Sequence, residues 1–194
     1  QLGATTLSTA AMMAAKSGYQ TALMAPTELL AEQHARTALK VLPAMGIRVG
    51  LLTGKLSAAE RRRALEEIEL GMVDVVVGTH ALIQGTVRFK SLGLGIVDEQ
   101  HRFGVMQRAR FLEQGMQSTG AMPHMLVMTA TPIPRTLALT VYGDLDVSII
   151  DELPPGRTPV VTKKFREAQR ESVYQRVAEA VSQGQQAYVV LPLV

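Results

Sequence analysis

The sequence predicts an α/β fold in which helices cover both faces of a parallel β-sheet. Short apolar runs alternate with helical segments along most of the chain, an alternation that is typical of such a sheet. The apolar runs are continuous rather than alternating with polar residues, as in strands buried on both faces. With 194 residues, of which 47% are hydrophobic, the chain can form a core of ordinary domain size.

Helices are predicted from capping residues and from apolar residues at helical spacing. Thr27 is a good N-cap for a helix in which Leu30, His34, Thr37 and Val41 lie near one face. Ser57 and Glu60 form a capping box at the next helix, and Gly71 closes it. In chain order, the predicted helices cover 7–17, 27–42, 57–70, 107–113, 135–142 and 167–182.

Strands are predicted where short apolar runs stand between turn residues. The run that begins at Val73 ends at Gly78-Thr79-His80, and the run that begins at Leu94 ends at two carboxylates. In chain order, the predicted strands cover 21–25, 49–52, 73–77, 94–97, 125–128, 147–150, 159–163 and 187–191.

The segment Asp151-Glu152-Leu153-Pro154-Pro155-Gly156-Arg157 predicts a boundary between two domains. Its prolines and glycine prevent a regular helix or strand. We therefore expect a first domain over 1–152, a linker over 153–158, and the start of a second α/β domain over 159–194. Residue 1 is not Met and the chain stops near a predicted strand, so the sequence is interpreted as a fragment.

Composition limits the classes of function. The net charge of +3 and the pI of about 9.4 permit a polyanionic partner without demanding one. The absence of Cys excludes disulfides, thiolate metal sites and a Cys nucleophile. No apolar stretch reaches membrane-spanning length and no secretory signal is visible. A cytoplasmic protein is expected, with no membrane partner.

The strongest chemical signal is the carboxylate pair Asp98-Glu99, directly after an apolar strand. Ligands of parallel α/β sheets bind outside the carboxyl ends of the strands. Such a pair suits nucleoside triphosphate hydrolysis, with Asp98 holding Mg²⁺ and Glu99 orienting the attacking water. Alone, the pair would favour an acidic turn. The Thr129-Ala130-Thr131 segment after a second strand supports the catalytic interpretation.

Four contiguous strings resemble superfamily 2 helicases, and within them the RecG branch-migration helicases. Residues 98–105 read DEQHRFGV and resemble motif II with its extension, and residues 129–136 read TATPIPRT and resemble motif III. Residues 24–34 read MAPTELLAEQH and resemble motif Ia, and residues 151–157 resemble the interdomain segment. The resemblance runs from about Gly18 to the end. It implies a RecA-like motor domain, of the P-loop nucleotide triphosphatase type, that uses ATP and Mg²⁺.

Two related families match less well. The transcription-repair coupling factor shares the RFGV and TATPIPRT strings, but its acidic motif reads DEEQ and its linker lacks LPPG. The replication-restart helicases have similar acidic motifs but lack these contiguous strings. The DEQH string and residues 153–157 therefore favour the RecG family.

The resemblance implies further roles at matching positions. Gln100 and His101 would sense the nucleotide state together with the catalytic pair, and Thr129, Ala130 and Thr131 would couple it to DNA. The positions implied to lie along the DNA backbone are Pro26, Thr27, Thr53, Gly54, Gly78, Thr79 and His80. Thr27 can also be a plain N-cap, and for His80 both a functional and a structural interpretation stay open. His34 is interpreted as a packing or surface residue rather than a ligand.

One part of the family pattern is missing. A phosphate-binding loop, Gly-x-x-x-x-Gly-Lys-Ser/Thr, should precede the first helix. Gly3, Thr5 and Thr6 lie where its end should fall, and they are the candidate ATP-binding residues, but no Lys follows Gly3. Three explanations are open. The sequence begins inside the loop, or the loop is left out so that its flanking residues appear joined, or another residue has replaced the Lys.

Two functions of different classes follow. The first is an ATP-driven double-stranded DNA translocase that acts on forks and Holliday junctions in recombination and repair, as a monomer. The arginine finger and wedge domain expected elsewhere in such a protein are absent here, so this chain alone should not unwind DNA. The second is a non-enzymatic module that only binds DNA or a partner. A motor of the coupling-factor type also stays open, and a metabolic α/β enzyme lacks any cofactor fingerprint.

Overall fold

The computed structural model describes residues 2–98, 105–129, 146–150 and 160–191. The chain divides into two compact units, Gln1–Ile150 and Asp151–Val194, and each is described by itself. The predicted linker at 153–158 and the predicted helix at 135–142 lie outside the described residues.

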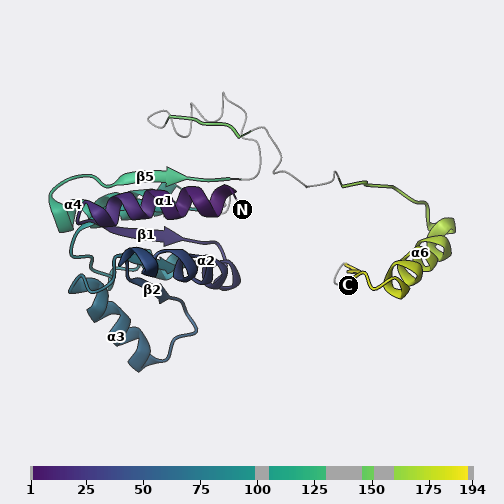
Figure 1. Ribbon diagram of the computed structural model, residues 1–194, viewed down its shortest axis with the longest axis horizontal. Helices are drawn as coiled ribbons and strands as arrows, with labels where there is room; N and C mark the ends of the chain where they lie inside the picture. The colour runs from purple at the N-terminus through teal and green to yellow at the C-terminus, as the bar shows by residue number, and fades with distance from the viewer. Residues whose placement is uncertain (1, 99–104, 130–145, 151–159, 192–194) are drawn as a thin grey trace. The chain divides into compact units, whose positions relative to one another are not determined.

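The first unit is built on a five-stranded sheet in the order β2-β3-β1-β4-β5, and every neighbouring pair is parallel. The strands are β1 (Gln20–Met24), β2 (Val49–Leu52), β3 (Val75–Gly78), β4 (Leu92–Val97) and β5 (His124–Val127). In Figure 1 the arrows of β1 and β5 point in the same direction. Every residue of β1 and β3 is buried, including the polar Gln20 and Thr21. The apolar runs within both strands predict burial on both faces.

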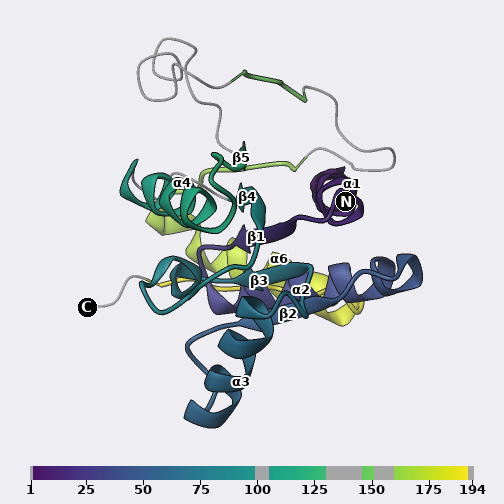
Figure 2. The ribbon, with the colours of Figure 1, turned by 90° about the vertical axis from the view of Figure 1, so that its left-hand side faces the viewer.

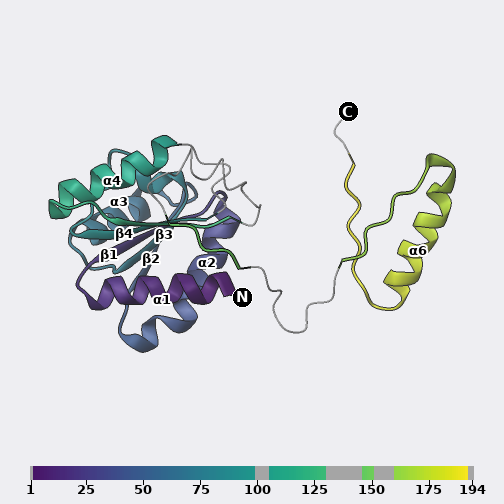
Figure 3. The ribbon, with the colours of Figure 1, turned by 90° about the horizontal axis from the view of Figure 1, so that it is seen from above.

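Helices cover both faces of this sheet, which confirms the predicted fold class. In Figures 2 and 3, α1 (Leu2–Lys16) and α2 (Glu28–Val41) lie on one face, and α3 (Ala58–Glu69) and α4 (Val105–Thr119) lie on the other. Successive residues of a strand point to opposite faces. Leu23 and Val77 therefore join the core under α1 and α2, and Met24 and Val76 join the core under α3 and α4.

Local signals explain where the helices begin and end. Thr27 caps α2, and its hydroxyl accepts a hydrogen bond from the Leu30 backbone N–H at 3.3 Å. Ser57 and Glu60 form the expected capping box at α3. Gly71 follows α3 with a φ of 69°, a left-handed conformation that favours glycine after a helix. The described part of this unit also contains two short 3₁₀ helices, η1 (Pro43–Met45) and η2 (His80–Ile83).

Three predicted strands are wrong in the described parts of the chain. Residues 147–150, 160–163 and 187–191 form no strand, and their apolar side chains are exposed, as Ile149, Val160 and Val190 show at 81%, 86% and 90%. A strand needs a neighbour for its backbone N–H and C=O groups. No described residue pairs with these runs. The described part of the second unit contains η4 (Glu167–Gln169) and α6 (Arg170–Ser182), neither with a buried residue.

The amino edge of the sheet is held by the buried side chain of Gln20. Its amide nitrogen donates to the carbonyl oxygens of Ile68 and Val73 at 3.0 and 2.8 Å. Its amide oxygen accepts from the backbone N–H groups of Lys90 and Ser91 at 2.8 and 3.1 Å. All four hydrogen-bonding positions of the amide are thus used. No local pattern in the sequence points to this role of Gln20.

Candidate nucleotide and nucleic-acid site

The predicted site segments gather at the carboxyl edge of the sheet, because all five strands are parallel. Backbone hydrogen bonds tie three of them to neighbouring strands. The Ala25 N–H donates to the Gly78 carbonyl at 2.9 Å, the Asp98 N–H to the Met24 carbonyl at 3.0 Å, and the Met128 N–H to the Val97 carbonyl at 2.9 Å. The segments after β1, β3, β4 and β5 are therefore neighbours. This is the edge at which open α/β sheets bind ligands.

Asp98 follows β4 directly and its side chain is 17% exposed. Its Oδ2 lies 2.6 Å from Nε2 of His34, which comes from α2. His34 is the only described residue whose side chain bonds this carboxylate. Glu99, Gln100 and His101, the other predicted catalytic residues, lie outside the described residues.

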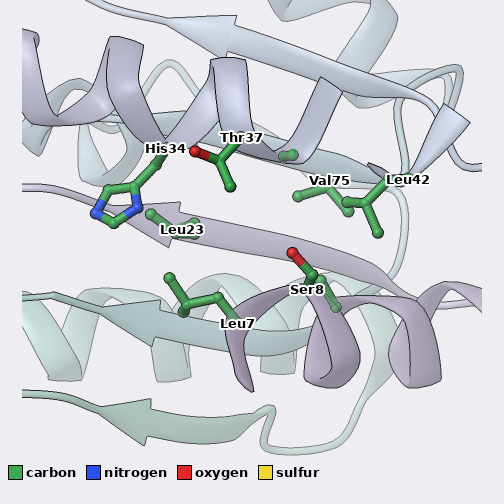
Figure 4. A pocket seen from close by; sticks show the side chains of 9 residues that line it. Leu7, Ser8, Leu23, His34, Thr37, Leu42 and Val75 are labelled. Carbon is green, nitrogen blue, oxygen red and sulfur yellow. The ribbon is translucent and has the colours of Figure 1, made fainter. Parts of the chain in front are cut away.

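His34 is the functional candidate that the sequence analysis missed. Its side chain is only 18% exposed and lines a small, mostly apolar pocket between α1, α2 and the sheet. Figure 4 shows the imidazole of His34 beside Leu23 of β1, with Leu7 of α1 across the pocket. The fully buried positions of α2 are Ala31, Ala35 and Ala38. His34 stands three residues from Ala31 and four from Ala38, a spacing that places it beside this sheet-facing stripe.

The candidate ATP-binding residues Gly3, Thr5 and Thr6 lie in the first two turns of α1. Figure 1 shows the N-terminal end of α1 at the edge toward which the β1 arrow points. The helix start and Asp98 therefore lie at the same edge of the sheet. Free backbone N–H groups and the helix dipole make a helix N-terminus suitable for phosphate.

The candidate DNA-binding residues divide into exposed and buried positions. Thr27, Gly54 and His80 are exposed and Pro26 is half-buried. Thr53 and Thr79 are each only 3% exposed. Gly78 is buried as well, and a Cβ on it would collide with the Leu52 carbonyl oxygen. The side chains of Thr53 and Thr79 therefore do not face an external ligand in this structure.

An ion-pair cluster joins the exposed residues after β2 to α2. The Lys55 ammonium lies 3.1 Å from Glu32 Oε1 and 3.6 Å from Glu28 Oε2. The hydrogen bond to Glu32 and the nearby negative charge raise the pKa of Lys55. This cluster joins the segment that contains Gly54 to the first turns of α2, beside Thr27.

Among the coupling residues, Thr129 is half-buried and follows β5 by two positions. Ala130 and Thr131 lie outside the described residues. Within the described ranges, no cluster of three or more His, Asp or Glu side chains could hold a metal ion. No described helix is long and apolar enough to cross a membrane.

The sequence profile of the family described as DEAD/DEAH box helicase matches residues 3–140. The chain belongs to the DEAD/DEAH box helicase family. The matched range starts in α1 and includes the five strands of the sheet. The parallel sheet with helices on both faces is therefore the RecA-like fold of a helicase motor domain. A helicase domain of this family uses ATP.

The relatives of this helicase domain include proteins named ATP-dependent DNA helicase RecG. The protein of Aquifex aeolicus is 55% identical over 92% of this chain, and that of Escherichia coli strain K12 is 53% identical over 95%. A solved structure of RecG bound to a three-way DNA junction is 43% identical over 97% of the chain, with a TM-score of 0.77. The chain spans 22% and 27% of the lengths of the two relatives, and 24% of the solved chain.

Proposed function

We propose that this chain is part of an ATP-driven double-stranded DNA translocase of the RecG type, which regresses stalled forks and migrates branches. It would supply the first motor domain over 1–152 and, after a linker at 153–158, the start of the second over 159–194. One observation carries the proposal. Asp98 stands at the carboxyl edge of a parallel sheet, near a helix N-terminus, in a chain 53–55% identical to RecG proteins over 92–95% of its length.

Asp98 is the residue proposed to hold Mg²⁺, and its surroundings fit this role. Mg²⁺ is commonly bound through one or two carboxylates, with phosphate oxygens and waters as the remaining ligands. Among the described residues, the one side-chain bond to the carboxylate uses Oδ2, which leaves Oδ1 for a cation. Bound Mg²⁺ would neutralise charge on the phosphates during transfer. The start of α1, whose first two turns contain Gly3, Thr5 and Thr6, would bind phosphate oxygens, and Glu99 would orient the water.

The remaining predicted roles belong to the same proposal. Gln100, His101, Thr129, Ala130 and Thr131 would transmit the nucleotide state to the DNA side. Thr27, Gly54 and His80 are the exposed candidates for phosphate contact, which positions a protein on DNA without reading sequence. The partner would be branched double-stranded DNA, which is the ligand named for the similar RecG structure. We retain the expectation of a monomer that acts in the cytoplasm.

The test is DNA-stimulated ATP hydrolysis by the longest native polypeptide that contains this chain. We compare the wild type with Glu99→Gln on branched and on linear duplex DNA. Removing the carboxylate that orients the water should lower turnover about 100-fold or more while ATP still binds. Glu69→Gln, a matched change at an exposed position of α3, should hydrolyse ATP like the wild type.

The competing function is a helicase-like module that binds DNA without hydrolysing ATP. The absence of a Lys after Gly3 favours it, because that Lys meets the β- and γ-phosphates in motors of this class. A wild-type protein that binds branched DNA and hydrolyses no ATP would establish the module and overturn the translocase. Hydrolysis stimulated by linear duplex alone would contradict the preference for branched DNA.

A further inference from the structure

Helix α2 and strand β4 are joined by a hydrogen bond between side chains 64 residues apart. Nε2 of His34 lies 2.6 Å from Oδ2 of Asp98. A carboxylate oxygen only accepts hydrogen bonds, so Nε2 carries the hydrogen and donates it. The two side chains are 18% and 17% exposed. Water therefore competes little for either partner, and the bond is stronger than an exposed one.

We infer that His34 is a positioning residue that sets the orientation of the Asp98 carboxylate for Mg²⁺. This inference rests on the proposed function, in which Asp98 is the metal ligand. The bond occupies Oδ2 and limits rotation of the carboxylate, and among the described residues Oδ1 receives no side-chain bond and stays available to a cation. Residues that hydrogen-bond to metal ligands commonly control metal affinity in this way.

Packing holds the imidazole in the orientation that this role needs. The residues around His34 in the pocket are mainly apolar and include Leu7 and Leu23. The nearest hydroxyl on the same helix, that of Thr37, donates to the Gln33 carbonyl at 3.0 Å. Among the described residues, Asp98 is the one hydrogen-bond partner of the His34 ring.

The same bond connects Asp98 to the proposed nucleic-acid contact. Helix α2 starts after its N-cap Thr27, and His34 lies seven positions further along, about 10 Å along the helix axis. The bond therefore links Asp98 to the helix that begins after Thr27.

The test compares His34→Leu with His34→Gln in the longest native polypeptide. Leu fills the space of the ring without a donor, and Gln keeps an N–H group at similar reach. The measurement is binding of a fluorescent ATP analogue as Mg²⁺ is titrated, without DNA. His34→Leu should raise the Mg²⁺ concentration for half-maximal binding about 10–100-fold. His34→Gln should stay near the wild-type value, and binding without metal should be equal in all three proteins.

A second measurement separates positioning from a general structural effect. In an Asp98→Asn background, His34→Leu should cause no further change in the Mg²⁺ titration, because the group it positions is gone. Urea unfolding without nucleotide or metal checks that each variant is folded. If His34→Leu does not fold, His34→Asn replaces it, since the shorter amide cannot span the bond to Asp98.

Each outcome decides the inference. Equal Mg²⁺ dependence of the wild type and His34→Leu would overturn it and leave the proposed function intact. Equal losses in His34→Leu and His34→Gln would also overturn it, because the hydrogen-bond donor would then not matter. A wild type with no Mg²⁺-dependent nucleotide binding would overturn the proposed function itself, and the inference with it.

Discussion

Gly78, at the end of β3, shows at the scale of one residue how the sheet edge constrains its sequence. A Cβ at this position would collide with the Leu52 carbonyl oxygen and lie 2.9 Å from Cγ of Leu82. The glycine is therefore required by the close approach of β2 and η2, whether or not nucleic acid contacts this edge. Packing alone accounts for this residue, which the sequence analysis assigned to DNA binding.

We predict that Gly78→Ala destabilises the chain by about 1–3 kcal/mol, because a methyl group forced into a packed site displaces its neighbours. Urea unfolding followed by circular dichroism measures the change. The matched control is Gly85→Ala, because a Cβ at Gly85 meets nothing within 4 Å. Equal stability of the two variants would show that the β2–β3 edge adjusts without cost.

At the scale of elements, Arg48 and Asp74 join the segments that lead into β2 and β3. The Arg48 guanidinium contacts both carboxylate oxygens of Asp74, at 2.7 and 3.0 Å, and the Arg48 backbone N–H donates to Oδ2 at 2.8 Å. Hydrogen bonds from the Arg48 side chain hold the pKa of Asp74 below its ordinary value of 3.8. The pair fixes the amino ends of two neighbouring strands.

The depressed pKa predicts how this pair contributes to stability at different pH. The contribution is fully present above the ordinary pKa of 3.8, and it is lost as the pH falls through the lower folded value. Asp74→Asn should therefore cost about 1 kcal/mol at neutral pH, a modest value because Arg48 is 54% exposed. The difference from the wild type should shrink in acid.

Urea unfolding of the wild type and Asp74→Asn at a series of pH values measures this dependence. The control is Glu69→Gln, at an exposed position of α3, because it removes a carboxylate and leaves the Arg48–Asp74 pair intact. A cost of Asp74→Asn that stays constant from neutral pH to strong acid would contradict the stabilising role of the Arg48–Asp74 pair. A protonated Asp74 is uncharged and should resemble the amide side chain of the variant.

At the scale of the whole molecule, the five-stranded unit depends on contacts between distant segments. Gln20 bonds to residues as far as 71 positions away, and it joins the end of α3 to the segments before β3 and β4. These bonds form only when the unit has folded, since their partners come from separate parts of the chain.

We predict that Gln20→Met costs about 3–5 kcal/mol, because it leaves two carbonyl and two N–H groups without a side-chain partner in a buried place. Gln33→Met is the matched control at an exposed position of α2, where about 0.5 kcal/mol or less is expected. Chemical unfolding measures both changes. A cost of Gln20→Met as small as that of the control would mean that water replaces the lost bonds.

The sequence by itself determined the elements whose signals are local. Capping residues located α2 and α3, and continuous apolar runs located the five strands, because these patterns reflect burial and hydrogen bonding within a short segment. The helix predicted over 107–113 was too short. Gly115 weakens an isolated helix, but α4 continues to Thr119, and Gly115 lets it pack closely on Pro123.

Only the tertiary structure decided which distant residues meet. The apolar runs at 147–150, 160–163 and 187–191 have strand-like sequences, yet none pairs with a described strand, because pairing depends on a neighbour and not on composition. His34 is one polar residue on a mainly apolar helix face when read along the chain. Its bond to Asp98 exists because α2 packs over β2 and β3 of the sheet that also contains β4, an arrangement of distant segments that no local pattern in the sequence encodes.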